Sequence, residues 1–230
     1  MKVSLIGHTG SPEEIVAAAA FQCYAAAGAE QLLKDLDRKK ASRRIRDCLS
    51  AGHHSVLEHA SFTFAVEGIS RVTSHQLVRH RLASYSQQSQ RYVRMGAGGE
   101  YVVPPSIGKR PDLKARVEKL FRDASDLYSQ LIESDIPPED ARYVVPSAAM
   151  TKIVLTMNAR ELLHFFSLRL CRKAQWEIRE LAGLILKAVR PAAPELFKSA
   201  GPPCREGTCP EGDAACEKKM KSDRVKRGRP

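Results

Sequence analysis

Three short strand-like segments among long helical stretches constrain the fold of this chain more than any other feature. Residues 2–7 alternate loosely, residues 62–66 alternate aromatic and polar side chains, and residues 151–157 are β-branched and apolar, which favours strands. Helical patterns occupy most of the remaining sequence, at residues 13–36, 43–51, 69–80, 112–134, 137–142, 159–170 and 174–189. Because the strands do not alternate regularly with helices, we predict an α+β fold with a mixed or antiparallel central sheet flanked by helices.

The composition changes toward the C-terminal end of the sequence. The 230 residues are 43% hydrophobic, which is enough for one buried core. After Pro191 the sequence becomes rich in Pro, Gly, Cys and Lys. We therefore predict a single domain over residues 1–200 and a flexible, poorly ordered Cys/Lys-rich tail over residues 201–230.

The cysteines and histidines raise the question of a metal site. The predicted tail holds three cysteines: Cys204, Cys209 and Cys216. Their spacing does not match the Cys-x-x-Cys pairs of a zinc ribbon, although they could ligate a metal together with a fourth group from elsewhere. His53, His54 and His59 are poorly spaced for one helix face, and no set of cysteines and carboxylates completes a shell around them. We therefore predict incidental thiols in the tail and no metal site.

The other cysteines lie in helical patterns, where we expect them to pack as small core residues. These are Cys23, Cys48 and Cys171.

The chain carries a formal net charge of +11, which favours anionic partners such as nucleotides, nucleic acids or acidic membrane surfaces. Part of this charge lies in residues 218–229, so it says little about a functional site. No segment approaches the roughly 18 apolar residues that span a membrane, and residues 1–7 are too short for a secretory signal. We therefore expect a cytoplasmic protein with reduced cysteines and no membrane partner.

The segment from Arg79 to Arg91 has the composition of an anion-binding site. Arg79-His80-Arg81 is followed at a fixed distance by Ser89 and Arg91, and nearly all side chains between them can form hydrogen bonds. Arginine suits a phosphate because its planar guanidinium contacts two oxygens at once. A basic triplet also occurs on solvated helix ends, so the triplet alone leaves both interpretations open. The longer pattern predicts a polar loop that cradles a nucleotide.

Several motifs in order resemble those of one enzyme family, the flavin-dependent thymidylate synthases. Arg79-His80-Arg81, seven further residues and then Ser89-x-Arg91 resemble its signature. Residues 52–59 resemble its His-x-Ser-x-x-Glu-His element. Further matches follow along the chain, at residues 141–142, 158–160, 164, 169 and 174–179. The resemblance covers residues 1–200, so that the predicted domain is the catalytic domain of such an enzyme.

The resemblance implies a homotetramer, with sites shared between subunits, that converts dUMP to dTMP. It implies 5,10-methylenetetrahydrofolate as the carbon donor, FAD as the hydride carrier and NADPH as the reductant. The implied FAD-binding residues are His53, Ser55, Glu58, Arg79, His80, Arg81, Asn158, Arg160 and His164. The implied dUMP-binding residues are Gln76, Arg79, Gln87, Ser89, Arg91, Arg142 and Arg169.

Arg169 is the catalytic residue that the resemblance implies. A fixed cation beside N3 and O2 of the uracil stabilises the anion formed when N3 loses its proton, and arginine stays charged. Some family members carry glutamate where this chain has Gln87, so we predict Gln87 as a contact only. Ser89 could act as a covalent nucleophile, but its sequence neighbours offer no good base. We therefore predict Ser89 as a hydrogen-bond donor to the substrate.

Other interpretations of these residues compete with the enzyme. Ser55-x-x-Glu58 and Asn158-x-x-Glu161 also fit capping boxes, which need no ligand. The net charge and the basic tail favour a nucleic-acid-binding protein as the alternative function. However, the sequence has only 6% aromatic residues and shows no signature of a nucleic-acid-binding fold. A helical scaffold would leave the polar segment 84–91 unexplained. We therefore expect small-molecule partners and no nucleic acid.

Overall fold

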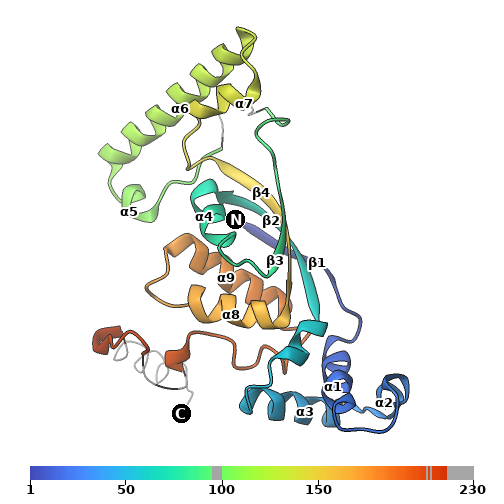
Figure 1. Cartoon of the computed structure of the whole chain (residues 1–230). Coiled ribbons are helices and arrows are strands. Elements are labelled where there is room, and N and C mark those ends of the chain that lie inside the picture. The colour runs from blue at the N-terminus through green and yellow to red at the C-terminus, as the bar shows by residue number, and fades with distance from the viewer. Residues whose placement is uncertain (95–99, 206, 208, 217–230) are drawn as a thin grey trace. The chain divides into compact units, whose positions relative to one another are not determined.

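The computed structural model describes residues 1–94, 100–205, 207 and 209–216. Within them, four strands form one antiparallel sheet in the order β1-β2-β4-β3 (Figure 1). The strands are β1 Lys2–His8, β2 Ser61–Ser70, β3 Ala83–Gln87 and β4 Met150–Asn158. The predicted α+β class with an antiparallel sheet is therefore confirmed.

Helices make up most of the remaining described chain. Their bounds are α1 Pro12–Gln22, α2 Ala29–Asp35, α3 Arg38–Ser50, η1 Ser55–His59, α4 Arg71–Leu77, α5 Pro105–Gly108, α6 Pro111–Glu133, α7 Pro138–Ala141, η2 Arg142–Val144, α8 Ala159–Arg169, α9 Trp176–Val189 and η3 Pro203–Arg205. In the described part of the chain, none of these helices has the length and apolar character needed to cross a membrane.

The largest differences between predicted and observed elements lie at residues 13–36 and 84–91. The helix expected over residues 13–36 is two helices, because Gly28 is extended before α2 and glycine is a weak helix former. The polar loop expected over residues 84–91 begins as strand β3. In β3, half-buried Ala83, Tyr85 and Gln87 alternate with exposed serines, which is the two-residue period of a strand.

The core prediction for the cysteines holds for one of three. Cys48 is buried, whereas Cys23 is exposed and Cys171 is half-buried. The reason is local: α1 ends at Gln22 and α8 ends at Arg169, so both thiols lie just beyond a helix.

The described chain divides into two compact units. Unit 1 comprises Met1–Lys2 and Ala65–Leu155, and unit 2 comprises Val3–Phe64 and Thr156–Pro230. The boundaries fall inside β1, β2 and β4, so each of these strands has residues in both units. The single domain over residues 1–200 stays a prediction. The predicted tail, residues 201–230, lies partly outside the described residues.

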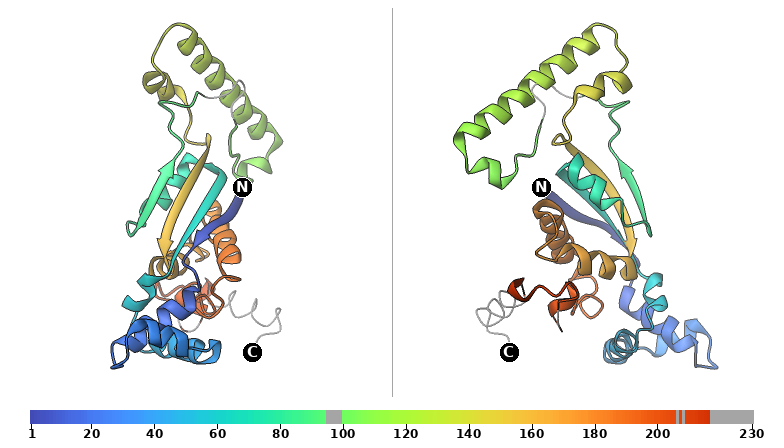
Figure 2. Two further views of the ribbon diagram at one scale, coloured as in Figure 1. Left: turned by 90° about the vertical axis from the view of Figure 1, so that its right-hand side faces the viewer. Right: turned by 60° about the vertical axis from the view of Figure 1, so that its left-hand side comes forward.

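Unit 2 has an aromatic core. The Phe62 and Phe166 rings meet the Phe197 ring edge-on, with centroids 5.4 and 5.9 Å away, and all three side chains are fully buried. Helices α8 and α9 lie side by side (Figures 1 and 2). This core fixes the start of α8, where the backbone N–H of Ala159 donates to the carbonyl of Ala60 at 2.8 Å.

We expect Phe166→Ala to destabilise the protein by about 3–5 kcal/mol, because it removes a fully buried ring and leaves a cavity. Leu168→Ala, on the same helix but 47% exposed, is the matched control and should change stability by less than about 1 kcal/mol. Urea denaturation measures both. Similar losses in the two variants would contradict the assignment of Phe166 to the core.

Unit 1 combines the ends of β2 and β4 with β3, α4 and the long helix α6. Helix α6 packs with α5 and α7 (Figure 2). The Tyr101 and Phe121 rings stack with centroids 4.4 Å apart, which attaches α6 to the segment before α5, where Tyr101 forms a β-bridge with Ala149. Leu77 on α4 is fully buried, so α4 is held firmly on the sheet residues of the unit.

Candidate active site

Unit 2 brings together two motifs that lie about a hundred residues apart in the sequence. The η1 motif carries the predicted flavin ligands His53, Ser55 and Glu58, and the start of α8 carries Asn158, Arg160 and His164. Nη1 of Arg160 donates to Oε1 of Glu58 at 2.6 Å. Both side chains remain about half exposed, so this ion pair stays open to a ligand.

The two capping-box predictions have opposite outcomes. Asn158 does cap α8, since its Oδ1 accepts a hydrogen bond from the backbone N–H of Glu161 at 2.9 Å. The box at Ser55 is wrong: the residue before η1 is His54, and no side chain caps this short helix. Ser55 lies inside the helical turn, while Glu58 pairs with Arg160 instead of a backbone N–H.

Glu161 is a buried acid that sequence reasoning did not single out as a site residue. Its side chain is 5% exposed, and burial raises its pKa while nearby His164 lowers it. His164 is exposed and lies four residues after Arg160, so both residues face the same side of α8. Their joint contact with a flavin stays a prediction.

A cavity of about 260 Å³ in unit 2 adjoins the η1 motif. Its lining comes from α1, α3 and the segment before η1, and includes His53 and Ser55. Arg44 also lines it: its Nη2 donates to the carbonyl of Ala20 at 2.8 Å, and its guanidinium lies 5.1 Å from the Tyr24 ring. The lining of this cavity thus combines a cation held over an aromatic ring with His53 and the carboxylate of Asp47.

In unit 1, Tyr85 shapes the turn that carries the basic triplet. Its hydroxyl lies 2.9 Å from the carbonyls of both Leu77 and His80, and donates to one at a time. Arg79 and Arg81 are exposed, whereas the His80 side chain is only 3% exposed. The two guanidinium groups are thus presented to solvent, while His80 is packed inside. Its role as a flavin contact stays a prediction.

Two of the predicted dUMP residues of unit 1 contact Glu139, one at its carboxylate and one at its backbone carbonyl. Nε and Nη2 of Arg91 each lie 2.7 Å from Oε2 of Glu139, and Nε of Arg142 donates to the Glu139 backbone carbonyl at 3.0 Å. Ser89 Oγ accepts from the backbone N–H of Arg91 at 3.1 Å. We call Ser89, Arg91 and Arg142 the cradle. Sequence reasoning missed Glu139, although its position three residues before Arg142 was a local hint.

The other dUMP candidates differ in their surroundings. Gln87 donates from Nε2 to Ser74 Oγ at 3.1 Å and to Thr151 Oγ1 at 3.2 Å, so its amide is already engaged within unit 1. Gln76 lies on α4 and is half-buried. Arg169 is half-buried too, but it ends α8 and belongs to unit 2.

The tail cysteines lie near a thiol from outside the tail. Burial raises the pKa of Cys204, and so does the proximity of Cys216, Cys171 and Cys209. Lys173, two residues after Cys171, pairs with Glu211 at 2.7 Å and with Asp213 at 3.4 Å, which holds the tail there. Among the residues that the structure describes, no group of three or more His, Cys, Asp or Glu side chains could hold a metal ion.

Comparison with known proteins matches this chain along most of its length. The family model described as "Thymidylate synthase complementing protein" matches residues 4–195. The flavin-dependent thymidylate synthase of Geobacter sulfurreducens is 50% identical over 226 residues, covering 98% of this chain and 97% of that protein. The enzyme of that name from Sulfolobus acidocaldarius is 47% identical over 205 residues, covering 89% and 78%.

A solved structure agrees with these matches. The crystal structure of the UMP/dUMP methylase PolB from Streptomyces cacaoi, bound with 5-Br dUMP, superposes with a TM-score of 0.74. The sequences are 27% identical, and the match covers 87% of this chain and 95% of that one. The chain is thus an α+β enzyme of the methyltransferase class. It belongs to the family of the flavin-dependent thymidylate synthases, as the resemblance of its motifs implied.

Proposed function

We propose that this enzyme reductively methylates dUMP to dTMP, with 5,10-methylenetetrahydrofolate as carbon donor, FAD as hydride carrier and NADPH as reductant. The observation that carries the proposal is the convergence of Arg91 and Arg142 on Glu139 beside Ser89. A nucleotide phosphate can replace the Glu139 carboxylate as the partner of Arg91, because it offers the guanidinium two oxygens at once. The names of the relatives, and the dUMP analogue in the Streptomyces structure, support the same substrate.

The predicted flavin-binding residues of each unit, taken separately, fit a part of FAD. Exposed Arg79 and Arg81 suit a diphosphate, and the Glu58–Arg160 pair offers a donor and an acceptor at one point. Asn158, Arg160 and His164 would hold the cofactor beside η1, because the backbone N–H of Ala159 at the start of α8 is bonded to the carbonyl of Ala60. When bound, the flavin supplies the hydride chemistry, while the protein supplies orientation and electrostatics.

The remaining roles concern the substrate and the assembly. Ser89 donates a hydrogen bond to dUMP, Gln76 and Gln87 line its binding site, and Arg169 stabilises the uracil anion. The enzyme acts in the cytoplasm as a homotetramer, with sites shared between subunits. Its partners are the three small-molecule substrates, without nucleic acid or membrane.

Release of tritium from [5-³H]dUMP tests the proposed reaction. We expect release that requires FAD, NADPH and 5,10-methylenetetrahydrofolate together, with dTMP as the product. Omission of each component in turn is the control. If the flavin-loaded protein, supplied with all components, released no tritium and formed no dTMP, the proposed function would be wrong.

We expect Arg160→Ala to weaken flavin binding about tenfold or more, because a charge-assisted hydrogen bond contributes about 1.5–3 kcal/mol. The same change should alter the free energy of unfolding of the flavin-free protein by less than about 1 kcal/mol, since the pair with Glu58 is half exposed. Flavin absorbance after titration and urea denaturation measure the two effects. Unchanged flavin affinity would remove Arg160 from the flavin site.

A further inference from the structure

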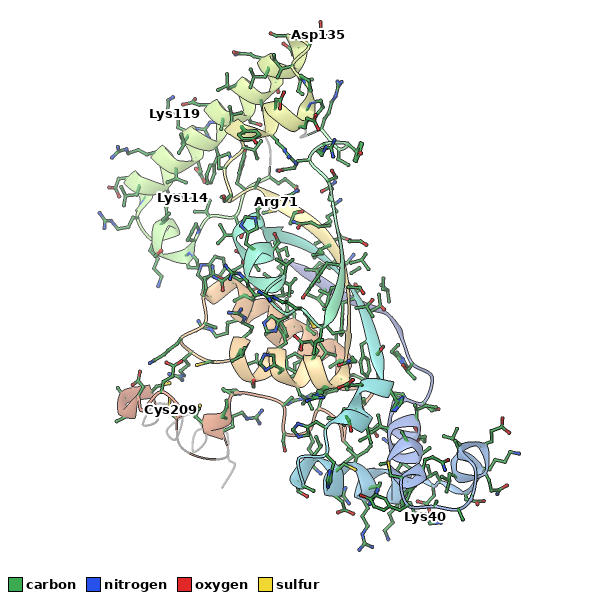
Figure 3. The ribbon with its side chains drawn as sticks, in the orientation of Figure 1. Lys40, Arg71, Lys114, Lys119, Asp135 and Cys209 are labelled. Carbon is green, nitrogen blue, oxygen red and sulfur yellow. The ribbon has the colours of Figure 1, made fainter. Side chains whose placement is uncertain are left out.

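Arg71 is a half-buried cation in unit 1 that neither the motifs nor the proposed reaction uses. It is the first residue of α4, where Figure 3 labels it. Its Nη2 donates to the backbone carbonyl of Gln88 at 2.8 Å. Its Nε is buried and has no hydrogen-bond partner in the described chain. Burial lowers the pKa of Arg71, and the positive charge of nearby Arg142 lowers it further.

The contact with Gln88 lies just before the cradle. The backbone N–H of Gln88 donates to the carbonyl of Lys152 on β4 at 2.9 Å, while its carbonyl accepts from Arg71. The backbone N–H and the backbone carbonyl of Gln88 are therefore both held by hydrogen bonds. The next residue is Ser89, whose Oγ and carbonyl accept from the backbone N–H groups of Arg91 and Val93 at 3.1 and 3.0 Å. Arg71 thus holds the point from which the Ser89–Arg91 turn starts.

The backbone of Arg71 is coupled to the same strand by a second route. Its carbonyl accepts from Ser74 Oγ at 3.0 Å, and Ser74 Oγ in turn accepts from Gln87 Nε2 at 3.1 Å. The N–H of Arg71 donates to the carbonyl of Ala149 at 3.1 Å. These bonds join the start of α4 to both β3 and the segment before β4. The backbone from which the Arg71 side chain extends is therefore held in place.

A purely structural role explains this arrangement poorly. A neutral donor would satisfy the Gln88 carbonyl without placing a second cation beside Arg142. Two neighbouring guanidinium groups in partly buried surroundings repel each other, unless an anion binds between or beside them. The Arg71 side chain therefore places a fixed donor to Gln88 and a positive charge next to the cradle, which favours an anion there.

We propose that Arg71 is a positioning residue of the nucleotide site, which fixes the Gln88 carbonyl and thereby sets the Ser89–Arg91 turn for the phosphate of a pyrimidine nucleoside monophosphate. This inference rests on the proposed function, because it takes the cradle as the phosphate site. Arg71 acts through Arg91 rather than on the reacting atoms. Its loss should therefore affect nucleotide affinity and leave flavin binding unchanged.

A double-mutant cycle of Arg71→Met and Arg91→Ala tests the proposal, with dUMP affinity of the flavin-loaded enzyme measured by calorimetry. We expect Arg71→Met alone to weaken dUMP binding about tenfold, which corresponds to one strong hydrogen bond. In the Arg91→Ala background it should have little further effect, because the residue through which it acts is gone. Flavin content and the melting temperature are recorded for every variant.

A control variant distinguishes a specific effect of Arg71 from a general effect of removing an arginine in unit 1. Arg110→Met removes an exposed arginine of unit 1 that lies 3.9 Å from Asp112, and should leave dUMP affinity unchanged. If Arg71→Met does not fold, Arg71→Ala carries the test, and Arg71→Lys, which retains a donor for the Gln88 carbonyl, should keep most of the wild-type dUMP affinity. Equal loss in both backgrounds, or no loss at all, would overturn the positioning role. If Arg91→Ala itself left dUMP binding unchanged, the cradle, and not Arg71 alone, would be wrong.

Discussion

Arg169→Ala is expected to lower turnover of dUMP about a hundred- to a thousandfold while the protein keeps its flavin, which is the loss seen when one oxyanion donor is removed. The uracil becomes a carbon nucleophile at C5 only when negative charge on N3 and O2 is stabilised. A guanidinium does this without titrating near neutral pH. Arg169 is half-buried at the end of α8, so its charge is partly shielded from solvent.

Tritium release and flavin absorbance measure the two halves of this prediction. Arg169→Lys retains the charge without the planar fork, and should fall between the wild type and the alanine variant. Arg46→Ala is the matched control: Arg46 also lies in unit 2, is 51% exposed and pairs with Glu195 at 3.0 Å. It should leave turnover unchanged. Full activity of Arg169→Ala would end the polarising role, and loss of flavin would reassign the residue to the cofactor site.

Elements with a regular pattern of apolar residues, such as β4, could be predicted from the sequence. Strand β3, which consists mainly of polar residues, could not. Strand β4 alternates buried and exposed residues along its length, with Ile153, Leu155 and Met157 inside, so its pattern was visible. Strand β3 shows the same alternation of burial, but apart from Ala83 it consists of serine, tyrosine and glutamine. Its burial arises only from its place at the edge of the sheet beside β4, which no local pattern records.

The site shows the same division between motif residues and their partners. The two flavin motifs were predicted by resemblance, but their ion pair between Glu58 and Arg160 joins residues 102 positions apart. Glu139 is 48 residues from Arg91, and Arg71 is 17 residues from Gln88. Such contacts are set by how the strands pair, so a sequence without tertiary information could not assign them.

Charge and cysteine content are informative only once they are located. The net charge of +11 favoured nucleic acid as much as nucleotides, because basic residues in a tail and in a binding site contribute equally to the net charge. The cysteines behaved similarly. Cys171 looked like a core residue by its helical pattern, yet it lies beyond α8 and close to the tail cysteines. Among the described residues, these thiols do not form a group that could hold a metal ion.

Arg91→Ala should weaken dUMP binding about thirtyfold or more while flavin affinity changes little, because truncating one partner of a hydrogen-bonded charge pair costs about 2–5 kcal/mol. In the unliganded protein Arg91 pairs with Glu139, with 52% and 48% of the two side chains exposed. An exposed pair of this kind contributes at most about 1 kcal/mol. A phosphate, with two charges and three acceptor oxygens, therefore competes well for the same guanidinium.

Glu139→Gln separates the contribution of the Arg91–Glu139 ion pair from that of the contact between Arg91 and the phosphate. It removes the competing carboxylate but leaves Arg91 in place, so dUMP affinity should stay the same or rise slightly. Deoxyuridine, which lacks the phosphate, should bind wild type and Arg91→Ala equally if Arg91 contacts only the phosphate. Calorimetry with both ligands decides the matter. Equal weakening of flavin and dUMP would mean that Arg91 supports the fold of unit 1, and a parallel loss of deoxyuridine would move its contact from the phosphate to the base.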